Sequence, residues 1–254
     1  MITTPLKIVI LNLSGNVGKT TLATHLLASY RPNAKIVSVE TQNNSEALKL
    51  KGRDVEEMPA QHFNRLLRIL MESDDLLVDV GSSNILRFME ELSRHQSAID
   101  EFDVFVIPTV PAEKQQKDTT RTISWLHEIG VNPEKIRVIF NQQTDHESLE
   151  YVFPHVMGYA CTDGKAKASW SRPPVVMINE VYGMLMKTGR SIKDTALDTT
   201  DYRARRMAAR KADDAAGFDA AFDAQVTRDL ALHAHKNLEQ AHLDLFAPVA
   251  AARA

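Results

Sequence analysis

The feature that most constrains this chain of 254 residues is a glycine-bearing loop between an apolar strand and an apolar helix. Residues 7–11 read KIVIL, residues 15–21 read GNVGKTT, and residues 22–27 read LATHLL. A strand, a glycine turn and a helix start, in that order, are how a phosphate-binding loop is built. Such a turn leaves backbone N–H groups free, and the helix adds more N–H groups and the positive end of its dipole. The chain is therefore predicted to bind a nucleoside triphosphate.

Within this loop, each residue type has an expected task. Lys19 would reach the outer phosphates, and the Thr20 hydroxyl would take a place on Mg²⁺. The residues predicted to contact the nucleotide here are Gly15, Asn16, Val17, Gly18, Lys19, Thr20 and Thr21. The alternative is a chance Gly-Lys-Thr at a helix start, and the flanking strand and helix argue against it.

Apolar runs alternate along the chain and predict strands and helices in turn. Strands are predicted at residues 7–11, 34–39, 76–80, 104–108, 136–140 and 175–178, and helices at 20–29, 61–71, 84–99 and 114–129. Continuously apolar strands, each followed by a helix, predict a doubly wound α/β fold with a mostly parallel sheet covered on both faces. Ligands bind such sheets at the carboxyl ends of the strands, which is where the loop lies.

The chain becomes alanine-rich and helical from about residue 201. Residues 1–200 are predicted to form the nucleotide-binding domain and residues 201–254 a helical C-terminal extension. Phe218, Phe222, Val226 and Leu230 recur every four residues and predict an apolar stripe that packs on the body or on another protein. The polar side of the stripe carries several acidic residues, which argues against a membrane-surface helix.

A group of cations precedes the stripe, namely Arg203, Arg205, Arg206, Arg210 and Lys211. They would contact DNA phosphates directly or form a solvated basic face balanced by nearby aspartates, and the sequence leaves both readings open. The formal net charge of the chain is −3, so any nucleic-acid binding must come from a local patch. The single cysteine, Cys161, excludes an internal disulfide and favours a reducing compartment. With no leader and no apolar run of about 18 residues, we expect a cytoplasmic protein.

Three polar side chains end predicted strands. Asp79, followed closely by Gly81, would hold Mg²⁺ or orient water beside the last phosphate, although a strand-ending aspartate can also cap a turn. Glu40 would orient the attacking water, and it is equally compatible with a surface acid. Asn141 offers an amide that suits the Watson–Crick edge of adenine, although asparagine is also common in turns. Lys19, Glu40 and Asp79 are thus the predicted catalytic residues, and Thr20 and Asp79 the predicted metal ligands.

Taken in order, these segments resemble the landmarks of the ParA/MinD superfamily of deviant Walker P-loop ATPases. Residues 14–20, SGNVGKT, match its K-G-G-x-G-K-[ST] loop at four fixed positions. Residues 39–42, VETQ, look like its D-x-D-P-Q segment, and residues 74–80, DDLLVDV, look like D-Y-hhh-D-T, where h is apolar. Residues 103–111 look like its strand ending in a proline motif. The resemblance covers about residues 5–195, and within the superfamily it is nearest to the StbB- and TraL-like plasmid stability and conjugation group.

The resemblance implies an ATP- and Mg²⁺-dependent switch that forms a nucleotide-dependent homodimer. Its expected task is plasmid partition, stability or conjugative transfer, with a DNA-binding adaptor or a transfer complex as protein partner. It also implies that Asn141 recognises adenine. Three positions depart from the family: Ser14 replaces a lysine that reaches across the dimer, Asn16 replaces a glycine, and Glu40 replaces an aspartate.

Ser14 and Glu40 motivate a second hypothesis, a non-hydrolysing, ATP-bound adaptor for a DNA-binding or membrane partner. Under the ATPase hypothesis, turnover is slow unless Lys187 and Arg190 compensate for the missing cation. A third hypothesis is a small-molecule kinase or ligase on the same fold, for which Arg172 and the lysines of residues 165–167 are the substrate-binding candidates.

Overall fold

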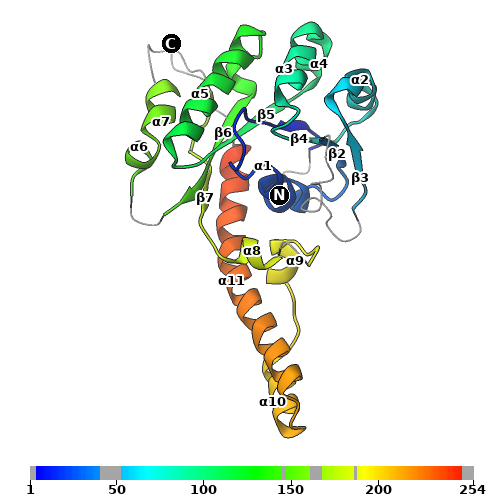
Figure 1. Cartoon of the computed structure of the whole chain (residues 1–254), viewed down its shortest axis with the longest axis vertical. Coiled ribbons are helices and arrows are strands. Elements are labelled where there is room, and N and C mark those ends of the chain that lie inside the picture. The colour runs from blue at the N-terminus through cyan, green and yellow to red at the C-terminus, as the bar shows by residue number, and fades with distance from the viewer. Residues whose placement is uncertain (1–3, 41–52, 145–146, 161–167, 186–187, 248–254) are drawn as a thin grey trace.

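The computed structural model describes residues 4–40, 53–144, 147–160, 168–185 and 188–247. Its centre is a seven-stranded sheet in the order β3-β2-β4-β1-β5-β6-β7, in which every pairing is parallel (Figure 1). The strands are β1 (Lys7–Ile10), β2 (Lys35–Val39), β3 (Val55–Met58), β4 (Leu76–Val80), β5 (Val104–Thr109), β6 (Ile136–Gln143) and β7 (Val175–Met177). The predicted doubly wound α/β fold is confirmed.

The central strand β1 lies between β4 and β5, with Ile8 opposite Leu77 on one side and Val104 on the other. From β1 the strand order runs outward in two directions, so the loop after β1 opens at the point where the topology reverses. Open parallel sheets bind their ligands at this point. The sheet therefore places the glycine-bearing loop where a ligand site is expected.

Helices cover both faces of the sheet. They are α1 (Lys19–Leu22), which continues as helical turns to Tyr30, α2 (Phe63–Glu72), α3 (Ile85–Arg94), α4 (Gln96–Glu101), α5 (Glu113–Glu128), α6 (Leu149–Val152), α7 (Pro154–Ala160), α8 (Val181–Leu185), α9 (Ile192–Ala196), α10 (Tyr202–Lys211) and α11 (Ala215–Leu245). Alternate residues of β1 enter two separate cores: Val9 packs with the α2–α5 layer, while Ile8 and Ile10 pack with α1, α8, α9 and α11. This alternation is why the strand is apolar throughout.

Helix α11 has 31 residues and belongs to two regions. Its second half lies on the sheet and buries Ala231, Ala234, Leu238, Ala241 and Leu245. Its first half pairs with α10 in a hairpin that projects from the body (Figure 1). The predicted stripe packs on the body only at its end, where Leu230 contacts the core, whereas Phe222 is 48% and Val226 36% exposed. Most of the contact between α11 and the sheet is made by small alanines, which allow the helix to lie close to the sheet.

An asparagine of α11 completes the outer edge of β7. Asn237 accepts a hydrogen bond from Met177 N through Oδ1 (2.8 Å) and donates one from Nδ2 to Val175 O (3.0 Å). An edge strand exposes such backbone groups unless something pairs with them. The second half of α11 is therefore fixed to the sheet by polar as well as apolar contacts.

One local prediction was wrong, and two elements were not predicted. The edge strand β3 was not predicted, because its sequence VEEM lacks an apolar run; it pairs with β2, with Val55 opposite Ile36. The single helix predicted at residues 84–99 is two helices, since His95 leaves the helical conformation at φ −124° and ψ 79°. Helix α7, Pro154–Ala160, was not among the predicted helices. No helix among the described residues is long and apolar enough to cross a membrane.

Candidate functional site

The loop between β1 and α1 contains two residues in the left-handed region of backbone space, Asn16 at φ 58° and Gly18 at φ 84°. Asparagine is among the non-glycine residues that tolerate this region best, which explains how Asn16 stands where the family pattern has glycine. Gly18 has a second constraint, because a Cβ there would lie 2.5 Å from Nδ2 of Asn141. The described residues supply no hydrogen-bond acceptor for the backbone N–H groups of residues 15–18. They are the donors that a phosphate group needs.

Asn12, which sequence reasoning missed, anchors the start of the loop. It is fully buried, and its Nδ2 donates to Pro108 O and to Thr119 Oγ1, both at 2.8 Å. Its Oδ1 accepts from Ser14 N at 2.8 Å. These contacts fix the loop to β5 and α5 before any ligand arrives. The sequence signal was a polar residue directly after an apolar strand, but its partners lie about a hundred residues away.

Lys19 is buried, with 7% of its surface exposed, and its side chain lies over the loop that precedes it. Its Nζ donates to Ser14 O at 2.8 Å and to Asn12 O at 3.4 Å. Burial lowers the pKa of Lys19, and the nearby carboxylates of Asp79 and Glu40 act in the opposite direction. The ammonium is thus held beside the free N–H groups by weak carbonyl partners, which phosphate oxygens can replace with stronger, charge-assisted bonds.

Thr20 and Asp79 meet as the sequence predicted, although 59 residues separate them. The Thr20 hydroxyl donates to Asp79 Oδ2 at 2.7 Å. Asp79 is 2% exposed, and its Oδ1 has no hydrogen-bond partner within the described residues. Burial raises the pKa of Asp79 to about 6, against the hydrogen bond from Thr20 and the charge of Lys19, which lower it. A buried carboxylate of this kind is costly without a cation or donor to meet it.

This pair fits Mg²⁺, which takes oxygen ligands, keeps several waters and shares its remaining positions with substrate phosphates. The described residues contain no group of three or more His, Cys, Asp or Glu that could hold a metal. An ion here would therefore be shared between Thr20, the Asp79 carboxylate and a bound phosphate. That arrangement needs the phosphate and the ion together.

Glu40 lies against the loop that follows β4. A Cβ on Gly81 would come within 1.7 Å of Glu40 Oε2, so the absence of a side chain at Gly81 makes this position available. Ser83 donates from its hydroxyl to Glu40 Oε1, and Asn84 Nδ2 donates to the same oxygen at 3.2 Å. Asn84 also accepts from Ala60 N at 3.0 Å. Ser83 and Asn84 were missed because a polar turn after a strand looks ordinary in sequence.

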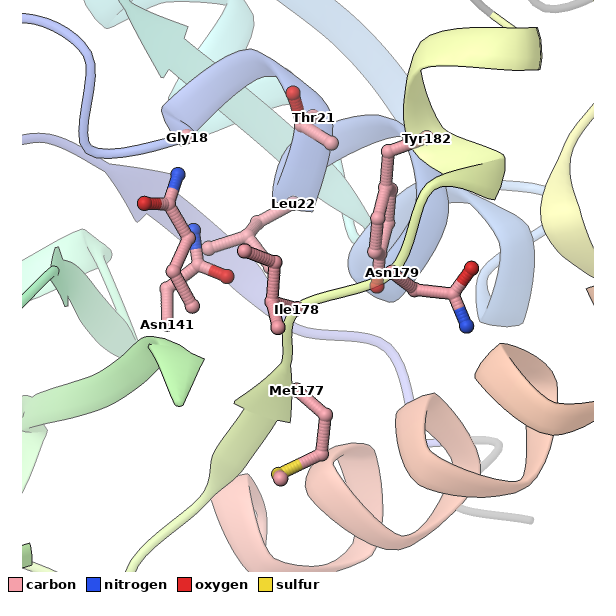
Figure 2. A pocket seen from close by; sticks show the side chains of 9 residues that line it. Gly18, Thr21, Leu22, Asn141, Met177, Ile178, Asn179 and Tyr182 are labelled. Carbon is pink, nitrogen blue, oxygen red and sulfur yellow. The ribbon is translucent and has the colours of Figure 1, made fainter. Parts of the chain in front are cut away.

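A cavity of about 250 Å³ opens beside the loop (Figure 2). Its wall is formed by Gly18, Thr21, Leu22, Asn141, Gln142, Met177, Ile178, Asn179 and Tyr182. Asn141 donates from Nδ2 to Val17 O at 3.0 Å, which ties the end of β6 to the loop. A register shift against β7 occurs between Asn141 and Gln143, and Gln142 takes φ 60°. The cavity is therefore continuous with the loop and mostly apolar, as a base or ring site requires.

The remaining candidates fall outside this arrangement. Ser14 is only 5% exposed, so its side chain is not presented to a second subunit. Arg190 is already paired with Asp198, at 3.0 Å. Arg172 lies before β7, at the amino edge of the sheet and away from the loop, and is 3.9 Å from Asp244. Lys187, Cys161 and the lysines of residues 165–167 lie outside the described residues.

Residues 8–155 match the family model described as the CobQ/CobB/MinD/ParA nucleotide binding domain. No curated protein matches the chain. The cell division ATPase MinD of Pyrococcus furiosus is similar in structure, with a TM-score of 0.53 at 14% identity over 92% of this chain and 98% of that one. The apo McdA structure from Cyanothece gives a TM-score of 0.52 at 16% identity, covering 87% of this chain and 99% of the other. At these identities, the structural similarity concerns the fold.

Proposed function

This chain belongs to the CobQ/CobB/MinD/ParA family of nucleotide-binding domains, and from that premise we propose that it is a Mg²⁺- and ATP-dependent switch. In this proposal residues 1–200 form the nucleotide-binding domain and residues 201–254 its helical extension. The switch acts in the cytoplasm, in the partition, stable inheritance or conjugative transfer of a plasmid. The plasmid role is supported by the ordered motif set of the sequence.

The observation that carries the proposal is the Thr20–Asp79 hydrogen bond at 2.7 Å beside the buried Lys19. It unites a helix start and a strand end that are distant in sequence, and it leaves one buried carboxylate oxygen for a cation. When bound, Mg²⁺ would neutralise charge on the outer phosphates. Lys19 would hold those phosphates, the N–H groups of residues 15–18 would cradle them, and Glu40 would orient the attacking water beside Gly81. Asn141 would read the adenine base at the wall of the cavity.

We further propose that the ATP-bound form pairs as a homodimer that engages a DNA-binding adaptor or a transfer complex. The buried Ser14 supports a variant of the switch in which position 14 provides no cation to its partner. An in-trans cation is worth roughly 10³–10⁵ in rate, so we expect turnover on the order of a few per hour by the chain alone. The same observation favours a second candidate function, a non-hydrolysing adaptor that ATP holds in one conformation.

The deciding experiment is ATP binding and steady-state hydrolysis with Mg²⁺, comparing the native chain with Lys19→Ala and Lys117→Ala. Lys117 is an exposed lysine on α5 whose partner is Glu113, so its loss controls for charge alone. We expect Lys19→Ala to weaken ATP binding about 100-fold, since charge-assisted hydrogen bonds contribute about 1.5–3 kcal/mol each. Equal binding by Lys19→Ala would refute the phosphate-loop assignment.

Turnover that Lys19→Ala and Asp79→Ala both abolish would support the switch. Tight, Lys19-dependent binding without turnover, even with duplex DNA added, would instead support the adaptor. Plasmid loss per generation, measured with the native and Lys19→Ala chains supplied in trans, tests the biological role. Equal loss rates would contradict it.

A further inference from the structure

A dense cluster of cations lies on α10, in the hairpin that projects from the body (Figure 1). We define the cationic face of α10 as Arg203, Arg205, Arg206, Arg210 and Lys211. These five of the chain's 30 Lys and Arg residues fall within ten residues, and α10 has no acidic residue, whereas the whole chain has a net charge of −3. A basic element in an acidic chain is the electrostatic pattern of a local polyanion site.

Ion pairing does not account for this face, although the Arg205 guanidinium lies over the Tyr202 ring, 5.9 Å from its centroid. None of its five side chains has an ion-pair partner within 4.0 Å among the described residues, and all but Arg206 are exposed. By contrast, the cations on the outer faces of α2, α3 and α5 are mostly paired, as in Arg68–Glu72 and Lys117–Glu113. The cations of α10 are therefore available to a partner.

Two of the nearby acids cap helices, and the dipole of α10 accounts only for Arg210 and Lys211, which lie in its last turn. Asp201 accepts from Ala204 N and Asp214 from Gly217 N, so each caps the start of a helix. Asp213 and Asp219 lie with Arg210 around a hollow at the hairpin tip. Arg203 and Arg205 occupy the first turn of α10, where the helix dipole disfavours positive charge. A helix selected for stability alone would place these two cations elsewhere.

We propose that the cationic face of α10 binds the phosphate backbone of a nucleic acid without reading its sequence. Four of the five cations are arginines, whose planar guanidinium groups match phosphate oxygens in pairs. The hairpin projects from the body, so a long rigid polyanion can reach it without meeting the sheet or its helices (Figure 1). Met207 is the only large apolar side chain that α10 exposes, at 48%, so the helix lacks the wide apolar face that a lipid surface requires.

The test is fluorescence anisotropy of a labelled 30-base-pair duplex of mixed sequence with the full-length chain, without nucleotide, over a series of salt concentrations. We expect a Kd of about 10⁻⁴–10⁻⁶ M, with log K falling against log salt by about 0.9 per phosphate contacted. Arg203→Gln/Arg205→Gln/Lys211→Gln should bind at least tenfold more weakly, and its salt slope should be smaller by about 2–3.

The matched control is Arg68→Gln/Arg87→Gln/Lys117→Gln, which removes the same charge from α2, α3 and α5 and should bind within twofold of the native chain. Equal loss in both triple variants would overturn the proposal, since it would show an effect of net charge. It would also be overturned if poly-glutamate or phosphatidylserine vesicles competed as well as unlabelled duplex at equal charge. Unchanged thermal unfolding of both variants shows that they are folded. Because the assay needs no ATP, Lys19→Ala should bind the duplex normally, which separates this inference from the proposed switch.

Discussion

At the carboxyl edge of the sheet, Lys19 and Asp79 are buried and each is hydrogen-bonded. On the projecting hairpin, by contrast, the cationic face of α10 is exposed except at Arg206 and has no ion pair among the described residues. Charges at the sheet edge depend on one another and on a ligand, so a small displacement changes several interactions together. The exposed cations of α10 have no such dependence on neighbouring charges and are solvated. The first region is suited to a specific small ligand and the second to a large partner bound by many weak contacts.

Helix α11 runs from the projecting hairpin to the sheet. The loss of unfolding free energy caused by substitutions along it therefore shows which part of the helix belongs to the cooperative core. Leu238→Ala should lower the free energy of unfolding by about 3 kcal/mol, because it leaves a cavity under the sheet. The same substitution at Leu232, which is 41% exposed, should cost less than about 1 kcal/mol, as should Phe222→Ala on the hairpin. Urea unfolding of the three variants tests this. A cost at Phe222 that equals the cost at Leu238 would show that the hairpin is part of the cooperative core.

Gly18→Ala disturbs the nucleotide end. The alanine would carry a side chain at φ 84°, and its Cβ would lie 2.5 Å from Nδ2 of Asn141. We therefore expect the free energy of unfolding to fall by about 1–3 kcal/mol and nucleotide binding to be lost. Gly158 on α7 is the matched control, because a Cβ there meets nothing within 4 Å and alanine should stabilise the helix by about 0.5–1 kcal/mol. Calorimetric titration with ATP and thermal melting check both. Normal ATP affinity in Gly18→Ala would show that the loop is not tightly constrained.

The pH dependence of stability tests whether burial dominates the environment of the Asp79 carboxyl group. Its pKa in the folded protein is raised from 3.8 to about 6, so the folded state holds its proton more tightly than the unfolded state. The contribution of this residue to stability therefore falls as pH rises from about 4 to about 6 and stays low above that.

Without ligand, Asp79→Asn should accordingly be more stable than the native chain by roughly 1–2 kcal/mol at pH 7, less than the full 1.36 kcal/mol per pKa unit because the amide is also buried. The difference should vanish below pH 4, and Mg²⁺-dependent nucleotide binding should be lost. Thermal melting at pH 4, 6 and 8 measures it. A constant difference across this range would mean that Asp79 does not titrate there.

The smallest effect is expected on the hairpin. Arg203→Gln and Arg205→Gln should each change stability by less than about 0.5 kcal/mol and leave ATP affinity within twofold, since glutamine and arginine have similar helix propensity. Melting curves and ATP titration of each single variant measure this. A change in ATP affinity beyond tenfold would contradict the separation of the two regions.

The sequence predicted most of the fold and the centre of the site. Strand β4 and the loop residues carried strong local patterns, so the meeting of Thr20 with Asp79 followed from the parallel sheet alone. What it did not show depends on tertiary contacts: Asn12 is defined by Pro108 and Thr119, and Asn84 by Glu40 and Ala60. The apolar stripe of α11 shows the same limit, because periodicity marks a hydrophobic face without showing what covers it. Leu230 packs on the core, whereas Phe222 is exposed.

The two hydrogen bonds from Asn237 to β7 also limit how this protein can associate. Met177 N and Val175 O are the groups through which an added strand would join that border of the sheet, and both are already engaged. A neighbouring copy, an unfolded chain or an extended peptide finds no backbone partner at these two positions. One side-chain amide thus stops sheet growth at this border and protects it against edge-to-edge aggregation.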